Sequence, residues 1–359
     1  DDAVDLLSGG YAQDPGSVSY LFRLSTLLAG QGKYSVAAEY LDKLHQLRPE
    51  DGQILYLAGE AYEHLGDYEA ALARYTSAIT KRPTDPEVWF ARARILLDLG
   101  EAQNAVRSAR QAVSLSDDWA EAWVFLGRAE KEAGSLQESR KTLSYASVIN
   151  PEDPEGWCLL GDVLFELREY PASSLAYSRA LQENPSYQQA RDGKIRVLCL
   201  TGEWNSALSE YDSSLIIRGE NFWDLYGKGM VLLDIDRIEE AHVNLERSLR
   251  YAENDPVALF NLANAWGELN DFKRAEELYV RSLTLNPEDS RVWCVRGHSL
   301  RDTGDYSEAV ICFDRALEID PDDDEAFFGR DACLKALEGE EVPLIITGMN
   351  HQPILKNGK

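Results

Sequence analysis

Apolar and small side chains recur along this chain with a period of 34 residues. Between Gly52 and Asp85 they occupy positions 4, 7, 8 and 11 of the unit, and again positions 17, 20, 24 and 27. Both sets have the i, i+3, i+4, i+7 spacing of one helical face, so each unit predicts two helices. Position 20 is small in every unit: Ala37, Ala71, Ala105, Ser139, Ser173, Ala207, Ala241, Ala275 and Ala309.

Glycine and proline mark the turns between these predicted helices. Glycine at position 15 readily takes the positive φ that ends a helix, and proline at position 32 has no N–H to continue one. The glycines are Gly32, Gly66, Gly100, Gly134, Gly202 and Gly304, and the prolines are Pro49, Pro83, Pro151, Pro185, Pro287 and Pro321. Where aspartate precedes proline, as at Asp85, Asp153 and Asp255, we expect it to cap the next helix.

The period divides the chain into an array with two different ends. Nine contiguous units are predicted at 18–51, 52–85, 86–119, 120–153, 154–187, 188–221, 222–255, 256–289 and 290–323. Residues 1–17 match the second helix of a truncated preceding unit. Residues 324–338 match a solitary capping helix with Phe327 and Leu334 directed inward. Residues 339–359 leave the repeat, and are either a flexible end or a segment that lies in a groove of the same or a neighbouring molecule.

These repeats resemble the tetratricopeptide repeat (TPR), whose signature is W-x2-L-G-x2-Y, A-x3-F, P. The matching residues include Trp123, Leu126, Gly127, Trp293, Gly297, Ala309, Phe313 and Pro321. The resemblance implies an all-α, right-handed superhelical solenoid of antiparallel helix pairs. It also implies that the first helix of each pair lines a concave face, with positions 2, 5, 9, 12 and 13 directed toward a ligand.

Charge narrows the range of partners. The formal net charge of −26 disfavours nucleic acid and favours a basic or mixed-charge protein. No apolar run is long enough to cross a membrane, so membrane insertion is not expected. We predict a cytoplasmic protein, with export left open because the sequence does not begin with methionine.

Catalytic and metal-binding motifs are absent from the sequence, including GxSxG, the P-loop, GxGxxG and HExxH. The five cysteines are scattered over different repeat positions without a CxxC pair, which indicates free thiols. We therefore predict no enzyme activity, no cofactor and no metal site.

The family geometry gives a set of candidate groove residues. They are Phe22, Tyr56, Phe90, Tyr226, Phe260 and Phe328 at position 5, Arg94, Arg128, Arg196 and Asn264 at position 9, and Glu132 and Glu166 at position 13. The aromatic side chains are either part of the repeat's packing or platforms for a peptide. Arg94 and Arg128 either pair with Asp98 and Glu132 four residues later or capture an anionic ligand. Arg196 has no such partner along its own helix.

The unit at 188–221 departs most from the pattern. Arg191 replaces a large apolar residue, Ile195 a small one and Gly219 the proline. Either this unit has a functional role or changed curvature, or it is a drifted repeat that still packs.

Together these observations predict a non-catalytic scaffold that binds a peptide segment of a partner in a concave groove. One alternative is a regulatory or targeting arm of a larger enzyme or secretion or assembly complex. The other is a self-associating structural array, with residues 339–359 as a possible contact.

Overall fold

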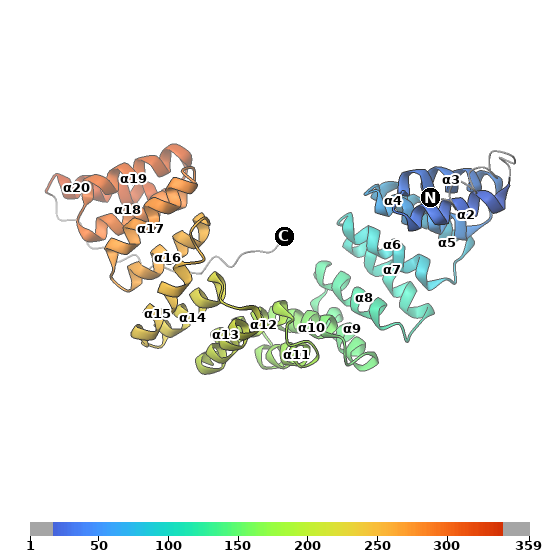
Figure 1. Cartoon of the computed structure of the whole chain (residues 1–359), viewed down its shortest axis with the longest axis horizontal. Helices are drawn as coiled ribbons and strands as arrows, with labels where there is room; N and C mark the ends of the chain where they lie inside the picture. Colours follow the sequence, from blue (N-terminus) through green and yellow to red (C-terminus); the bar gives the residue numbers. More distant parts are fainter. Residues whose placement is uncertain (1–16, 340–359) are drawn as a thin grey trace. The chain divides into compact units, whose positions relative to one another are not determined.

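The computed structural model describes residues 17–339, and every regular element in that range is an α-helix (Figure 1). The predictions for residues 1–16 and 340–359 lie outside the described residues. The first helices of successive pairs are α2 (Val18–Gly30), α4 (Gly52–His64), α6 (Pro86–Asp98), α8 (Ala120–Glu132), α10 (Pro154–Glu166), α12 (Gln188–Leu200), α14 (Phe222–Asp234), α16 (Pro256–Glu268), α18 (Ser290–Thr303) and α20 (Asp324–Leu337).

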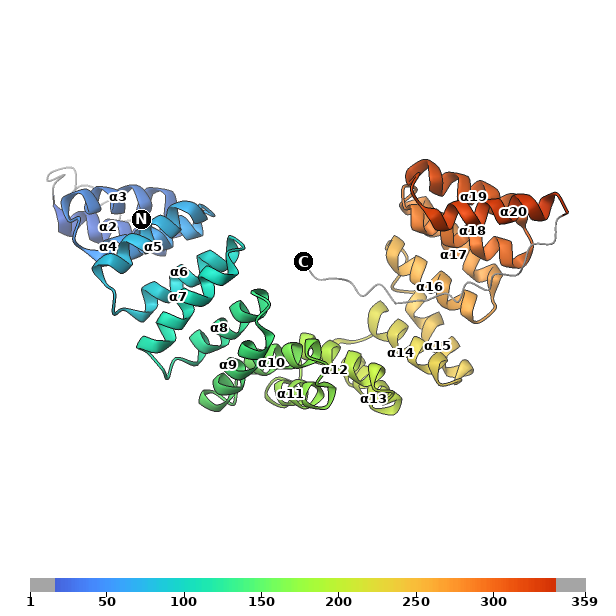
Figure 2. The same cartoon turned by 180° about the vertical axis from the view of Figure 1, so that it is seen from behind.

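Each first helix up to α18 is followed by a second helix that completes its pair. The second helices are α3 (Tyr34–Leu47), α5 (Tyr68–Lys81), α7 (Ala102–Leu115), α9 (Leu136–Ile149), α11 (Tyr170–Glu183), α13 (Trp204–Arg218), α15 (Ile238–Leu249), α17 (Phe272–Leu285) and α19 (Tyr306–Ile319). These nineteen helices of the described range confirm the all-α prediction, and the hairpins can be followed from both sides in Figures 1 and 2.

The chain divides into two compact units, one up to Val197 and one from Leu198 onward, so the division falls inside α12. In the first unit each helix from α2 to α11 packs against the next one along the chain. In the second unit the same is true from α13 to α20. Stacking of neighbours, rather than one central core, therefore buries the apolar faces in each unit.

Positive φ at position 15 is a property of every described hairpin turn. The six predicted glycines have φ between 74° and 90°, as expected. Arg168, Asp236 and Asn270 stand at the same position in the other three units and have φ of 62°, 58° and 60°. In the turn at Arg168, the Glu169 N–H donates to the Leu164 carbonyl at 2.8 Å. The pairing of the two helices therefore dictates the turn even where the residue is not glycine.

The predicted aspartate caps are confirmed. The side chains of Asp85, Asp153 and Asp255 accept hydrogen bonds from backbone N–H groups two or three residues later, at the starts of α6, α10 and α16. Such caps satisfy donors that the helix itself leaves open.

The small residues of the pattern sit where helices approach closely. Tyr177 of α11 is completely buried, and its ring lies against Gly161 of its own pair and Gly193 of the next pair. The two serines at position 20 are buried as well, and each donates its hydroxyl back to the first helix. Ser139 donates to the Gly127 carbonyl at 2.6 Å and Ser173 to the Gly161 carbonyl at 2.7 Å. The serines therefore substitute for alanine without leaving a buried polar group unpaired.

Arg191 of the irregular unit takes the place of a tryptophan found at the same position elsewhere. At position 4, Trp89, Trp123, Trp157 and Trp293 each donate the indole N–H to the carbonyl six residues earlier, at 2.8 to 2.9 Å. Arg191 occupies this position in α12, is buried, and donates to the Pro185 carbonyl at 2.6 Å. The drifted-repeat interpretation therefore describes Arg191, because its guanidinium makes the bond that tryptophan makes elsewhere.

The prediction for the inward face of α20 is wrong. Phe327 and Leu334 are 49% and 44% exposed, because no helix follows α20 within the described residues to cover them.

Candidate functional site

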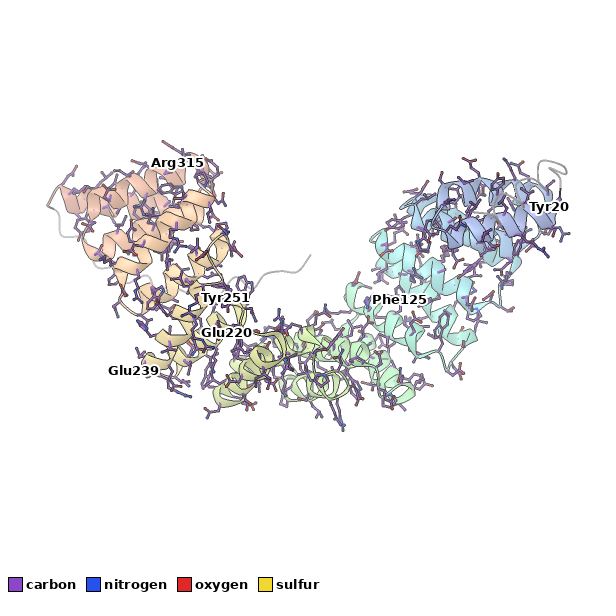
Figure 3. All side chains as sticks on the ribbon, viewed as in Figure 1. Tyr20, Phe125, Glu220, Glu239, Tyr251 and Arg315 are labelled. Carbon is purple, nitrogen blue, oxygen red and sulfur yellow. The ribbon has the colours of Figure 1, made fainter. Side chains whose placement is uncertain are left out.

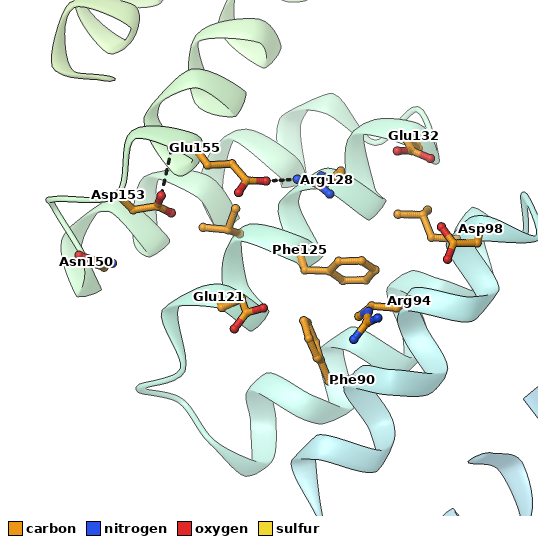
Figure 4. A pocket seen from close by; sticks show the side chains of 12 residues that line it. Phe90, Arg94, Asp98, Glu121, Phe125, Arg128, Glu132, Asn150, Asp153 and Glu155 are labelled. Carbon is orange, nitrogen blue, oxygen red and sulfur yellow. Dashed lines mark hydrogen bonds and ion pairs between the residues drawn. The ribbon is translucent and has the colours of Figure 1, made fainter. Parts of the chain in front are cut away.

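A hollow of about 640 Å³ lies in the first unit between α6, α8 and the start of α10 (Figure 4). It brings together four of the predicted groove residues, Phe90, Arg94, Arg128 and Glu132. The full lining is Phe90, Arg94, Leu97, Asp98, Glu121, Val124, Phe125, Arg128, Glu132, Asn150, Asp153 and Glu155.

The floor of this hollow is aromatic. Phe125 extends from α8 and is half-buried, and its ring meets the ring of Phe90 edge-on at a centroid distance of 5.2 Å (Figures 3 and 4). Phe90 itself is buried against Trp119, at 4.6 Å between the ring centroids. Phe90 therefore supports Phe125, whose ring is the more exposed of the two.

Sequence reasoning missed Phe125, Leu97 and Glu121. Phe125 stands at position 6, which the groove assignment left out. A comparison of position 6 across the repeats would have found it, because Phe125 is the only aromatic residue there. The other residues at position 6 are Arg23, Leu57, Ala91, Leu159, Gly193, Gly227, Asn261, Val295 and Gly329.

The two arginines of the hollow are already paired, but not as predicted. Arg94 forms an ion pair with Glu63 of α4, and Arg128 forms one with Glu155 of α10. The predicted pairing with Asp98 and Glu132 along the same helix is wrong. A long arginine side chain reaches sideways to a carboxylate on a neighbouring first helix instead.

This pairing leaves a surplus of carboxylates around the aromatic floor. Asp98, Glu121 and Glu132 are exposed, and no ion pair to them is found within residues 17–339. The remaining two lining carboxylates are engaged, since Asp153 caps α10 and Glu155 holds Arg128. The hollow therefore combines an apolar floor with a negative rim.

Tyr56 lies next to this region on α4, where it is partly buried beside Glu60. Burial first, and the nearby Glu60 carboxylate second, raise the pKa of the Tyr56 hydroxyl well above its usual value. Burial also raises the pKa of Glu60. Tyr75 completes the cluster by donating its hydroxyl to Glu63 at 2.7 Å, so Glu63 receives both Tyr75 and Arg94.

Arg196 and Glu166 of the predicted set lie outside the hollow. The Arg196 guanidinium lies over the Phe165 ring at 4.2 Å and is 3.9 Å from the Asp162 carboxylate, so it finds a partner on α10. Glu166 pairs with Lys131 of α8 at 3.1 Å. Both residues therefore tie neighbouring helices together.

In the second unit the predicted aromatic residues divide into buried and exposed ones. Tyr226 and Phe260 are buried in the cluster around Trp266, whereas Phe328 on α20 is exposed. Asn264 accepts a hydrogen bond from the Tyr279 hydroxyl at 2.7 Å. Phe22, at the other end of the described range, is partly exposed in the first unit. Position 5 is thus covered inside each unit and uncovered at the terminal helices.

Within residues 17–339 the thiols and histidines are not grouped as a metal site requires. No group of three or more potential ligand residues is found within residues 17–339. Burial raises the pKa of Cys158 to about 12 and that of Cys199 and Cys312 to about 11, so these thiols stay protonated at neutral pH. Burial lowers the pKa of His298 to about 4, so its ring is neutral beside Glu325. Across the described residues, no helix has the length and apolar character that a membrane span requires.

Curated relatives match part of this chain. Anaphase-promoting complex subunit 3 of Schizosaccharomyces pombe is 26% identical over 170 residues, which are 45% of this chain and 24% of that protein. Protein FlbA of Caulobacter vibrioides is 29% identical over 137 residues, which are 36% of this chain and 22% of that protein. The matched regions therefore span about a quarter of each relative's length.

Among solved structures, a tetratricopeptide repeat protein from Parabacteroides merdae superposes with a TM-score of 0.50 at 16% identity. The superposition covers 69% of this chain and 98% of that one, and it supports the likeness of fold.

Family models for the tetratricopeptide repeat match residues 28–95, 90–154, 256–289 and 290–323. Together these matches cover more than half of the chain. With the packed helix pairs, they show that the chain belongs to the tetratricopeptide repeat family and forms a protein-interaction domain.

Proposed function

We propose that this chain is a non-catalytic scaffold that holds a peptide segment of a partner protein in the hollow between α6, α8 and α10. The observation that carries the proposal is the half-buried Phe125 ring surrounded by three carboxylates without an ion pair in the described range. An aromatic ring at the centre of a concave site supplies much of the binding energy of an interface.

The charges favour a partner segment with lysine or arginine next to an apolar side chain. Arg94 and Arg128 are each neutralised by a carboxylate of a neighbouring helix, so an anionic ligand would have to displace an existing ion pair. Asp98, Glu121 and Glu132 are available to a basic side chain. The net charge of −26 adds a long-range attraction for the same class of partner.

Binding to an array of random seven-residue peptides tests this proposal. Peptides with an aromatic or leucine side chain flanked by lysine or arginine should be enriched. For an enriched peptide, Phe125→Ala should weaken the affinity by about tenfold or more, because the buried apolar contact is lost. Leu175→Ala on α11 removes an equally apolar, exposed side chain outside the hollow and should leave the affinity unchanged.

The charge contribution has its own matched pair of variants. Glu132→Gln removes one carboxylate from the rim, and Glu183→Gln makes the same change on α11, away from the hollow. Glu132→Gln should lower the affinity for the enriched peptide several-fold, and Glu183→Gln should leave it unchanged. Equal affinity of Phe125→Ala and the parent protein would remove the hollow as the binding site.

A second candidate function is an arm of a larger assembly. Two facts about the relatives favour an arm. The matched regions are about a quarter of each relative's length, and one relative is named as a subunit of a complex. Co-purification of the protein from its native source distinguishes the two, because an arm would remain in a stoichiometric complex when Phe125 is replaced by alanine. A self-associating array would instead show a mass that rises with concentration in light scattering.

A further inference from the structure

The last helix of the described range, α20, leaves an apolar face uncovered. Ala326, Gly329 and Cys333 form a buried stripe on α20, which packs on α18 and α19. On another side of the helix, Phe327, Leu334 and Leu337 are exposed. Phe327, Leu334 and Leu337 together form the α20 face.

The corresponding face of the other first helices is covered. Leu334 stands at position 11 and is 44% exposed, whereas its counterparts Leu96, Leu232 and Leu300 are at most 9% exposed. Phe327 stands at position 4, where Leu225 and Leu259 are completely buried. Leu96, Leu232 and Leu300 each pack in a cluster with residues of the second helix of their pair. Phe327 and Leu334 are therefore side chains at positions that this fold buries in those units.

We propose that residues 340–359 of the same chain cover the α20 face. They follow α20 directly, after Gly339, whose φ of 81° is typical of a residue that ends a helix. The attachment gives this segment a high effective concentration at the face, on the order of millimolar for a short flexible connection.

The sequence of the segment fits an extended cover better than a second helix. Val342, Leu344 and Ile346 alternate with Pro343 and Ile345, so an extended backbone presents the first three on one side. Pro343 stands where the other units have the small residue of helix B, which disfavours a helix there. A helix of 14 residues is roughly 21 Å long, and about seven extended residues retrace it. Residues 340–347 therefore suffice to cross the α20 face.

Charge complementarity also supports a segment that runs back along α20 from its C-terminal to its N-terminal end. The residues that lead into α20 include Asp320, Asp322, Asp323, Asp324 and Glu325, which make its N-terminal end strongly negative. A segment that retraces α20 with residues 340–347 continues from that end into the stretch that carries Lys356 and Lys359, which these carboxylates attract. These two lysines are the only charged residues after Glu341.

A second copy of the chain is the competing occupant, and Phe328 separates the two cases. Phe328 is 66% exposed at position 5, and its counterpart Phe90 in α6 meets the ring of Phe125 on the next first helix, α8. End-to-end stacking of two molecules would use Phe328. The proposed cover from residues 340–359 does not need it.

Hydrogen exchange of the α20 amides in the full chain tests the proposal. Ending the chain after Gly339 should make these amides exchange about tenfold faster, while exchange in α4 stays unchanged. The full-length triple variant Val342→Ser, Leu344→Ser, Ile346→Ser should behave like the shortened chain. Ile345→Ser is the matched control, because its side chain lies on the opposite side of an extended segment.

Three results would overturn the proposal. One is identical α20 exchange in the full, shortened and triple-variant chains. Another is equal acceleration by Ile345→Ser and by the triple variant. The third is a dimer in light scattering that dissociates when Phe328 is replaced by serine and protects α20 only at high protein concentration. None of these results depends on the hollow at Phe125, so the two proposals succeed or fail separately.

Discussion

At the scale of single residues, position 15 shows how the fold imposes a conformation on whatever residue is present. Six units have glycine there and three do not, yet all nine have positive φ. A residue with a β-carbon pays roughly 1 kcal/mol or more in this region, and asparagine and aspartate pay less because they bond locally. Arg168 is therefore the most strained of the three.

Replacing Arg168 by glycine should stabilise the first unit. We expect an increase of about 0.5 to 1 kcal/mol in the free energy of unfolding, measured as a higher urea midpoint, because the strain at φ of 62° is removed. Arg168→Ala retains the β-carbon and should give no increase. Asn270→Gly should have a smaller effect. A lower midpoint for Arg168→Gly than for Arg168→Ala would contradict this account.

The arginine pairs also belong to the residue scale. Arg94 and Arg128 have carboxylates four residues later, and a sequence offers no reason to look elsewhere. Their partners, Glu63 and Glu155, are 31 and 27 residues away along the chain. Only the stacking of neighbouring units brings these groups together, and Asp98 and Glu132 then have no ion pair within residues 17–339.

At the scale of elements, helices approach most closely where a glycine meets an aromatic ring. A β-carbon at Gly161 would lie 2.6 Å from the Tyr177 ring, and one at Gly193 would also be well inside contact distance of that ring. Tyr177 is completely buried and donates its hydroxyl to Asp162 at 2.7 Å, so it has little room to move. The packing of α10, α11 and α12 therefore depends on both glycines.

Gly193→Ala should destabilise the protein by about 2 kcal/mol or more, because the added methyl group overlaps a ring that cannot shift. Gly267→Ala is the matched control. It also lies in a first helix, but no atom comes within 4 Å of the position a β-carbon would take. Alanine there should stabilise α16 by about 0.5 to 1 kcal/mol through its higher helix propensity. Thermal unfolding should therefore shift in opposite directions for the two variants, and a shift in the same direction would refute the argument.

At the scale of the whole molecule, charge dominates. The chain has 62 acidic and 36 basic side chains. The surplus carboxylates repel one another in the folded state and attract basic partners. Salt screens both effects, over a Debye length of about 10 Å at 0.1 M.

Salt should accordingly affect stability and binding in opposite directions. Raising sodium chloride from about 0.02 M to about 0.5 M should raise the Tm and lower the association rate of a lysine-containing peptide about tenfold or more. The dissociation rate should change much less. A peptide of the same length with glutamine in place of lysine provides the control and should associate at a nearly salt-independent rate. Parallel changes in Tm and association rate would rule out this interpretation.

The sequence by itself determined the all-α fold, the pairing of helices within each period, the six glycine turns and the aspartate caps. It could do so because each of these depends on residues within one 34-residue period. Through the family resemblance it also assigned Phe90, Arg94, Arg128 and Glu132, with eight further residues, to one groove, and these four line the same hollow.

Only the tertiary structure decided what those residues do. It buried Phe90, Tyr226 and Phe260, left Phe125 half-buried and the α20 face exposed, and exchanged the expected partners of the arginines. Each of these outcomes depends on which neighbouring helix covers a position, and the period is the same whether a neighbour is present or absent. A repeat therefore specifies its own two helices locally, while the free surface is decided by the stacking.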